Sequence, residues 1–164
     1  VDGASASALM GKYFNSIKQK FEIYIPDRKT EGYGPSEKGF DHLIENKSTL
    51  IFTVDCGTMS FKPIDFAVNK KIDVIVLDHH QSEIKLPNAY SIVNPNRIDD
   101  NSKLNYLCAS GVTFMFLIAF FSPKALVLEY KLLEFSDAPK AEICMNFEIR
   151  FSLQISEIKL GRNE

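Results

Sequence analysis

The stretch DVIVLDHH, residues 73–80, decides the fold and raises the question of function. It begins with an apolar, mostly β-branched run and ends with an aspartate and two of the three histidines in the whole sequence. An apolar run without alternation is typical of a strand that is covered on both faces, as in a parallel sheet. The stretch TLIFTVD, residues 49–55, has the same pattern. We therefore predict two buried parallel strands, each with a carboxylate at its end.

Helical and strand patterns alternate on both sides of these two strands. Such alternation predicts an α/β fold with a doubly wound, mainly parallel sheet, in which ligands bind beyond the carboxyl ends of the strands. Asp55 and Asp78 are therefore expected at the same edge of the sheet. The predicted helices cover residues 5–20, 36–47, 63–70 and 111–121, and two further strands cover residues 21–25 and 90–95.

A change of pattern after Phe121 predicts a domain boundary. The alternating helices and strands lie before it, whereas residues 143–155 alternate apolar and polar side chains, as a half-exposed strand does. We expect residues 1–121 to form the α/β domain. Residues 122–164 are expected to form a divergent tail that is either strand-forming or poorly ordered.

Composition narrows the classes of protein to consider. A net charge of −2 gives no support to nucleic-acid binding, although a local basic groove is compatible with it. Three cysteines without a CxxC motif indicate neither a disulfide framework nor a zinc site, and they favour a reducing, cytoplasmic setting. The longest apolar run, residues 111–121, is too short to span a membrane and is expected to be a buried helix. We therefore expect no membrane association.

Asp55, Asp78, His79 and His80 are the main candidates for chemistry. Hard divalent cations prefer carboxylate oxygens, and imidazole adds affinity for manganese. Because these side chains follow neighbouring strands, we predict a metal site in which one histidine binds the cation and the other faces a substrate phosphate. The alternative is structural: residues 78–80 form a polar loop, and Asp55 caps a helix.

Three other segments admit either a binding role or a structural one. Asp2, in the turn VDGAS, suits a cradle for a metal or a phosphate, and equally a simple helix cap. Arg28 and Tyr33, in the loop DRKTEGYG, suit phosphate contact and base stacking, or a charged surface loop. The small residues of LCASGVTF, residues 107–114, bring backbone amides to an anion or allow close helix packing.

Several of these motifs together resemble one family, the DHH phosphoesterases, and within it the RecJ-type single-strand-specific exonucleases. The resemblance rests on blocks that follow one another in the expected order and cover most of residues 1–116. They are VDGASASAL (1–9), IPDRKTEGYG (25–34), LIFTVDCGTMS (50–60), VIVLDHHQSE (74–83), LPNAYSIVNPN (86–96) and LCASGVTFMF (107–116).

The resemblance implies a hydrolase that uses two metal ions, Mn²⁺ or Mg²⁺, to degrade single-stranded DNA from its 5′ end in DNA repair and recombination. In this scheme Asp55 bridges the metals, His79 is a ligand and His80 faces the scissile phosphate. The implied metal ligands are Asp2, Asp55, Asp78 and His79, the implied catalytic residues are Asp55, Asp78, His79 and His80, and the implied substrate-binding residues are His80, Arg28 and Tyr33.

The sequence also departs from the family pattern. The family block has two aspartates before the one that Asp2 matches, and a later apolar segment with a metal-binding aspartate, which Asp137 does not resemble. We therefore expect the front part of a DHH domain, truncated at both ends, with little activity of its own. The alternatives are a DHH enzyme that acts on small phosphates or oligonucleotides, such as a pyrophosphatase, and a remnant without activity. The choice between the two metals and the oligomeric state are not predicted.

Overall fold

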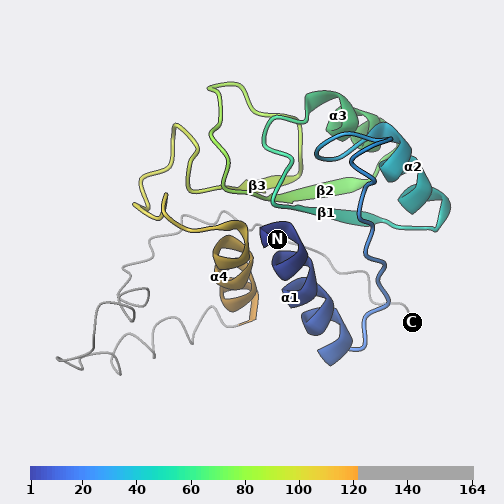
Figure 1. The fold of residues 1–164 in the computed structure, drawn as a ribbon, viewed down its shortest axis with the longest axis horizontal. Coiled ribbons are helices and arrows are strands. Elements are labelled where there is room, and N and C mark those ends of the chain that lie inside the picture. Colours follow the sequence, from blue (N-terminus) through green and yellow to red (C-terminus); the bar gives the residue numbers. More distant parts are fainter. Residues whose placement is uncertain (122–164) are drawn as a thin grey trace.

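The computed structural model describes residues 1–121 and confirms the predicted α/β class. The predicted tail and its alternating strand lie outside the described residues. The elements of the described part, drawn in Figure 1, are α1 (Asp2–Ser16), α2 (Glu37–Glu45), β1 (Leu50–Val54), α3 (Phe61–Asn69), β2 (Asp73–Leu77), β3 (Ser91–Val93) and α4 (Ala109–Phe121).

A parallel sheet of three strands, in the order β1-β2-β3, forms the centre of the described fold. Val54 at the end of β1 lies opposite Leu77 at the end of β2, and Leu77 in turn lies opposite Val93 at the end of β3. The strands therefore end level with one another, so the residues that follow them meet at one edge. Figure 1 shows α2 and α3 on one face of the sheet and α1 and α4 on the other.

Alternating side chains of β2 divide the core into two clusters. Val74 and Val76 pack with residues of α2 and α3, whereas Ile75 and Leu77 pack with residues of α1 and α4. All four are at most 2% exposed. Both faces of β2 are thus covered, which explains why its sequence shows no polar alternation.

Local signals account for some helix boundaries and not for others. The Oγ of Ser36 accepts a hydrogen bond from the Gly39 amide at 3.0 Å and caps α2, at the predicted start of this helix. Helix α1 instead begins at Asp2, inside the stretch predicted as a turn, and ends at Ser16, before its predicted end. Lys18, with a φ of 57°, leaves the helical conformation and turns the chain away.

The strand predicted over residues 21–25 is wrong, because the segment has no regular secondary structure. The ring of Phe21 packs against that of Phe14 in α1, with centroids 5.6 Å apart. The hydroxyl of Tyr24 donates to Glu31 in the following loop at 2.7 Å. Phe21 and Tyr24 are therefore held by a helix and a loop instead of by strand pairing, whereas Ile23 and Ile25 are exposed.

The apolar run near residue 115 forms α4, as predicted. Val112, Phe116 and Leu117 are buried in the cluster that covers one face of β2. Among residues 1–121, no helix is long and apolar enough to span a membrane.

Candidate metal centre

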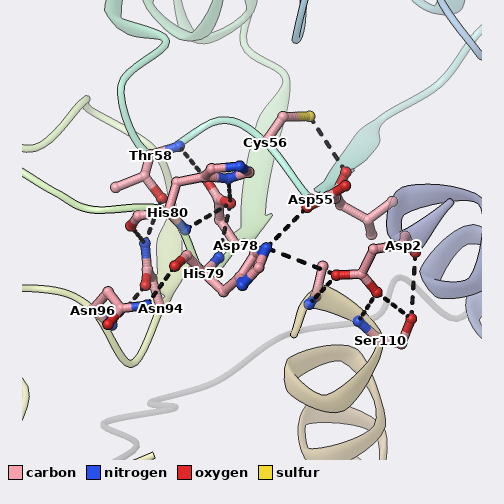
Figure 2. A network of polar contacts seen from close by, with 12 residues as sticks. Asp2, Asp55, Cys56, Thr58, Asp78, His79, His80, Asn94, Asn96 and Ser110 are labelled. Carbon is pink, nitrogen blue, oxygen red and sulfur yellow. Dashed lines mark hydrogen bonds and ion pairs between the residues drawn. The ribbon is translucent and has the colours of Figure 1, made fainter. Parts of the chain in front are cut away.

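The two residues after β2 leave the sheet in opposite directions. Because side chains alternate along a strand, Asp78 continues the row that faces α2 and α3, and His79 continues the row that faces α1 and α4. Asp78 is 1% exposed. The side chain of His79 is 29% exposed. The motif therefore provides a buried carboxylate followed by an accessible imidazole. Figure 2 shows how the two side chains lie.

Both carboxylate oxygens of Asp78 accept hydrogen bonds. Oδ2 accepts the Thr58 amide at 3.0 Å, and Oδ1 accepts the amides of His79 at 2.8 Å and His80 at 3.3 Å. Nδ1 of the His80 ring also lies 2.6 Å from Oδ1. Burial raises the pKa of Asp78, but these hydrogen bonds outweigh it, so the pKa is lowered. Asp78 is therefore an ionised anchor that orients the His80 ring and leaves its Nε2 facing away from the anchor.

Asp55 turns its carboxylate toward His79. Its backbone is in the left-handed region, with a φ of 61°, which aspartate tolerates better than most residues. Oδ1 of Asp55 lies 3.2 Å from Nε2 of His79. A Cβ at Gly3 would lie 3.2 Å from both Cβ and Oδ2 of Asp55. Glycine at position 3 therefore allows the start of α1 to approach this carboxylate.

Asp2 joins the start of α1 to the start of α4. Its carboxylate accepts the amides of Ala109 at 2.6 Å and Ser110 at 3.0 Å, and the Ser110 hydroxyl at 2.6 Å. Burial raises the pKa of Asp2, but these bonds outweigh it and the pKa is lowered. Oδ2 of Asp2 also lies 3.7 Å from Nε2 of His79. The small residues at the start of α4 were predicted to bring backbone amides to an anion or to allow close helix packing. The anion bound there is the carboxylate of Asp2, in the same chain.

The loop with Arg28 and Tyr33 reaches the site through the tyrosine. The Tyr33 hydroxyl lies 3.1 Å from the carbonyl oxygen of Asp55, to which it donates, and 3.2 Å from Nε2 of His80. Cζ of Arg28 lies 5.4 Å from the centre of the Tyr33 ring. Glu31 anchors the loop by accepting the Asp27 amide at 3.1 Å. Tyr33 is therefore in contact with the site, whereas Arg28 is connected to it through the aromatic ring.

Cys56 packs beside the site and is partly buried. Its thiol donates to the Val54 carbonyl at 3.4 Å. Burial, followed by the negative charges of Asp78 and Asp55, raises the pKa of Cys56 to about 12. The thiol therefore stays protonated at neutral pH and is a poor ligand and nucleophile.

Ligand atoms of Asp55, His79 and His80 all lie within 4.8 Å of one another, which makes them the candidate metal group of the described residues. The side chains of these residues are 22%, 29% and 46% exposed, so a hydrated cation can reach them. The donor set consists of the Asp55 carboxylate and two imidazoles, and the Asp2 carboxylate lies close to His79. Such a mixture of oxygen and nitrogen donors suits Mn²⁺. Asp78 belongs to the same loop, but its oxygens point into the protein.

Sequence reasoning missed three polar residues that support this group: Thr58, Asn94 and Asn96. Asn94 is 3% exposed and donates to Thr58 Oγ1 and to the His80 carbonyl, both at 2.8 Å. Asn96 donates to the His79 carbonyl. Asn94 directly follows β3, just as Asp55 and Asp78 follow their strands. The rule that located the two aspartates, applied to the third strand, would have found Asn94.

Comparison with known proteins identifies a family and several relatives for this chain. Residues 1–137 match the family model described as the DHH family, N-terminal domain. The chain is 34% identical over 113 residues to the single-stranded-DNA-specific exonuclease RecJ of Bacillus subtilis, an alignment that covers 69% of this chain and 14% of that protein. It is 35% identical over 119 residues to the RecJ of Escherichia coli, covering 72% of this chain and 21% of that one. The chain thus spans about a fifth or less of the length of these relatives.

Two solved structures share the fold. The crystal structure of an exonuclease RecJ bound to manganese superposes with a TM-score of 0.64 at 28% identity, over 74% of this chain and 31% of that one. The structure of RecJ in complex with Mn²⁺ from Thermus thermophilus gives a TM-score of 0.59 at 23% identity, over 76% of this chain and 17% of that one.

Proposed function

The chain belongs to the DHH family, and from this premise we propose that it supplies part of the catalytic centre of a RecJ-type hydrolase, a metal-dependent exonuclease specific for single-stranded DNA. The observation that carries the proposal is the convergence of Asp55, His79 and His80 within 4.8 Å at the carboxyl edge of the sheet. The relatives are single-stranded-DNA-specific exonucleases, which supports single-stranded DNA as the substrate.

The proposed metal is Mn²⁺ or Mg²⁺, held by Asp55 and His79, with Asp2 and His80 next to them. The donor set fits such an ion, since carboxylate oxygens suit both cations and imidazole favours manganese. A related RecJ structure contains manganese, which supports the choice. A divalent cation bound here would activate water for attack on a phosphodiester and stabilise the negative charge that develops on the phosphate.

Asp78 and His80 act as a pair in this proposal. Asp78 holds Nδ1 of His80 at 2.6 Å, so Nε2 is presented toward the side on which Tyr33 lies. We assign His80 the role of binding the scissile phosphate through Nε2 and Asp78 the role of orienting it. The prediction that Asp78 is itself a metal ligand stays a prediction, since it requires an oxygen of Asp78 to exchange hydrogen bonds for a cation.

Substrate contacts are proposed for the loop of Arg28 and Tyr33. The exposed ring of Tyr33 can stack on a base, and the Arg28 guanidinium can bind a backbone phosphate. Digestion from the 5′ end, participation in DNA repair and recombination, and a cytoplasmic setting complete the proposal. The predicted boundary at residue 121, between a partial DHH domain and a tail, is part of it as well.

A graft tests whether these residues can support digestion of DNA, and the bare chain tests whether they can do so alone. The matching segment of the Escherichia coli relative is replaced by this chain's residues, and digestion of labelled single-stranded DNA in Mn²⁺ is compared with that by the bare chain. We expect the graft to digest DNA and the bare chain to show little activity, because three converging ligands are few for two divalent cations.

Two substitutions in the graft control this assay. Asp55→Asn should abolish digestion, whereas Asp65→Asn, at an exposed position on α3, should leave it unchanged. A folded graft that hydrolyses pyrophosphate or dinucleotides but leaves single-stranded DNA intact would replace the proposed substrate. A folded graft whose digestion survives Asp55→Asn would refute the proposed centre.

A further inference from the structure

The turn after β3, residues 94–96, holds the backbone of the histidine pair. The Asn94 side-chain amide donates to the carbonyl oxygen of His80 at 2.8 Å, and the Asn96 amide donates to that of His79. Asn94 Oδ1 accepts the backbone amide of Asn96 at 2.8 Å, which couples the Asn94 side chain to the backbone of Asn96. Figure 2 shows both asparagines next to the two histidines, on the side away from Asp2 and Asp55.

The side chains of Asn94 and Asn96 provide hydrogen bonds beyond the point where the backbone bonds of the sheet end. The last backbone bond between the two strand ends runs from the Asp78 amide to the Val93 carbonyl at 3.0 Å. Beyond it the chain has left the ladder, and the carbonyls of His79 and His80 are bound by side chains instead. A turn that follows a strand would otherwise be among the more mobile parts of a fold. The asparagines therefore extend the order of the sheet to the loop that carries the candidate ligands.

Asn94 is also connected to the anchor beneath the histidines. Its Nδ2 donates to Thr58 Oγ1 at 2.8 Å, and the Thr58 amide donates to Asp78 Oδ2 at 3.0 Å. One side chain thus touches both the backbone of His80 and the residue that binds its Asp78 partner. Asn94 is 3% exposed, so water cannot easily replace these bonds.

We propose that Asn94 and Asn96 are positioning residues, which fix the backbone of His79 and His80 so that the His79 ring meets Asp55 in a geometry that binds a divalent cation. The inference deepens the proposed function and rests on its metal site. Neither asparagine touches the cation. Residues that orient metal ligands in this way typically change metal affinity about 10–100-fold when they are mutated.

The test replaces each asparagine by its isosteric acid. In Asn94→Asp and Asn96→Asp a carboxylate oxygen faces a carbonyl oxygen, so each bond becomes a repulsion with little change in volume. The matched control is Asn88→Asp, at an exposed position in the loop before β3. Mn²⁺ affinity is measured by calorimetric titration, and stability by urea unfolding of the metal-free chain. We expect both variants to bind Mn²⁺ about 10–100-fold more weakly than the control, which should bind like wild type.

Ring signals in NMR spectra of the metal-free chain give a second readout. The sequence has three histidines, and His42, on α2 away from the site, is an internal reference. In each variant the signals of His79 and His80 should shift and broaden, while those of His42 stay in place. Asn96→Asp keeps the test decisive if Asn94→Asp fails to fold, because Asn96 is less buried.

The outcomes distinguish the inference from the function on which it rests. Folded variants with wild-type Mn²⁺ affinity and unchanged His79 and His80 signals would overturn the positioning role. A wild-type chain that binds no Mn²⁺ would overturn the metal site, and with it the inference. An added negative charge by itself attracts Mn²⁺, so equally weakened Mn²⁺ binding in Asn88→Asp would show a nonspecific effect of substitution and also overturn the positioning role.

Discussion

Replacing the buried anchor, Asp78→Asn, should destabilise the fold by about 2.5–4 kcal/mol. Asparagine has nearly the same shape, but one carboxylate oxygen becomes an NH₂ group and the charge is lost. The least disruptive orientation of the new asparagine keeps an oxygen toward the His79 and His80 donors and turns the NH₂ toward the Thr58 amide. In the wild type this amide donates to Oδ2 of Asp78 at 3.0 Å. A donor then faces a donor in a site that is 1% exposed.

The magnitude follows from those contacts. Loss of one hydrogen bond to a charged group costs about 1.5–3 kcal/mol, and the buried Thr58 amide left without a partner adds about 1 kcal/mol. With an m-value of roughly 2 kcal/mol/M for a small domain in urea, the unfolding midpoint should fall by about 1–2 M. Asp65→Asn, at an exposed position on α3, is the control and should leave the midpoint unchanged.

The pH dependence of this difference has a definite sign. The pKa of Asp78 is lowered from its ordinary 3.8 in the folded protein, so its ionised form contributes stability at pH values above 3.8. That contribution is lost as the pH falls through the lowered folded-state pKa. The gap between wild type and Asp78→Asn, measured by urea unfolding at several pH values, should therefore be full above pH 3.8 and narrow below it. A change of less than about 0.5 kcal/mol at neutral pH, or a gap that widens in acid, would refute the role of Asp78 as an ionised anchor.

Three further expectations concern residues around the anchor. Iodoacetamide at pH 8 should label exposed Cys108 much faster than Cys56, whose pKa is raised to about 12; peptide mass spectrometry measures both rates, and equal labelling would contradict the burial of Cys56. Gly57→Ala should cost roughly 2–6 kcal/mol in urea unfolding, because φ is +115° and the new Cβ would lie 2.5 Å from Thr53 Oγ1; a neutral effect would contradict this backbone. Asp2→Ala should cost about 1–2 kcal/mol by loss of the cap on α4, and an unchanged unfolding midpoint would show that the cap contributes nothing.

The sheet and its edge could be predicted from sequence because the signals are local. Unbroken apolar runs located β1 and β2, and the polar residues that follow them located Asp55, Asp78 and His79. The strand-end rule was not applied to β3, and for that reason Asn94 was missed. The false strand at residues 21–25 had the right composition but pairs with no strand among residues 1–121.

The orientation of the two aspartates could not be read from the sequence. Both follow a parallel strand, yet Asp55 adopts a φ of 61° and faces His79, whereas Asp78 points into the protein. The difference depends on tertiary neighbours. Gly3 leaves room beside Asp55, and the Thr58 amide donates a hydrogen bond to Asp78. Contacts between segments far apart in the chain carry no local pattern.

We propose that Asp55 and His79 form the core of a divalent-metal site at the carboxyl edge of the sheet. Crystals of the chain grown with Mn²⁺ test it through the anomalous signal of the metal. We predict a manganese peak between the two side chains, roughly 2–2.6 Å from Oδ1 of Asp55 and Nε2 of His79, two atoms that lie 3.2 Å apart in this structure. A peak held by other residues, or no peak at saturating Mn²⁺ with the pair still in contact, would contradict it.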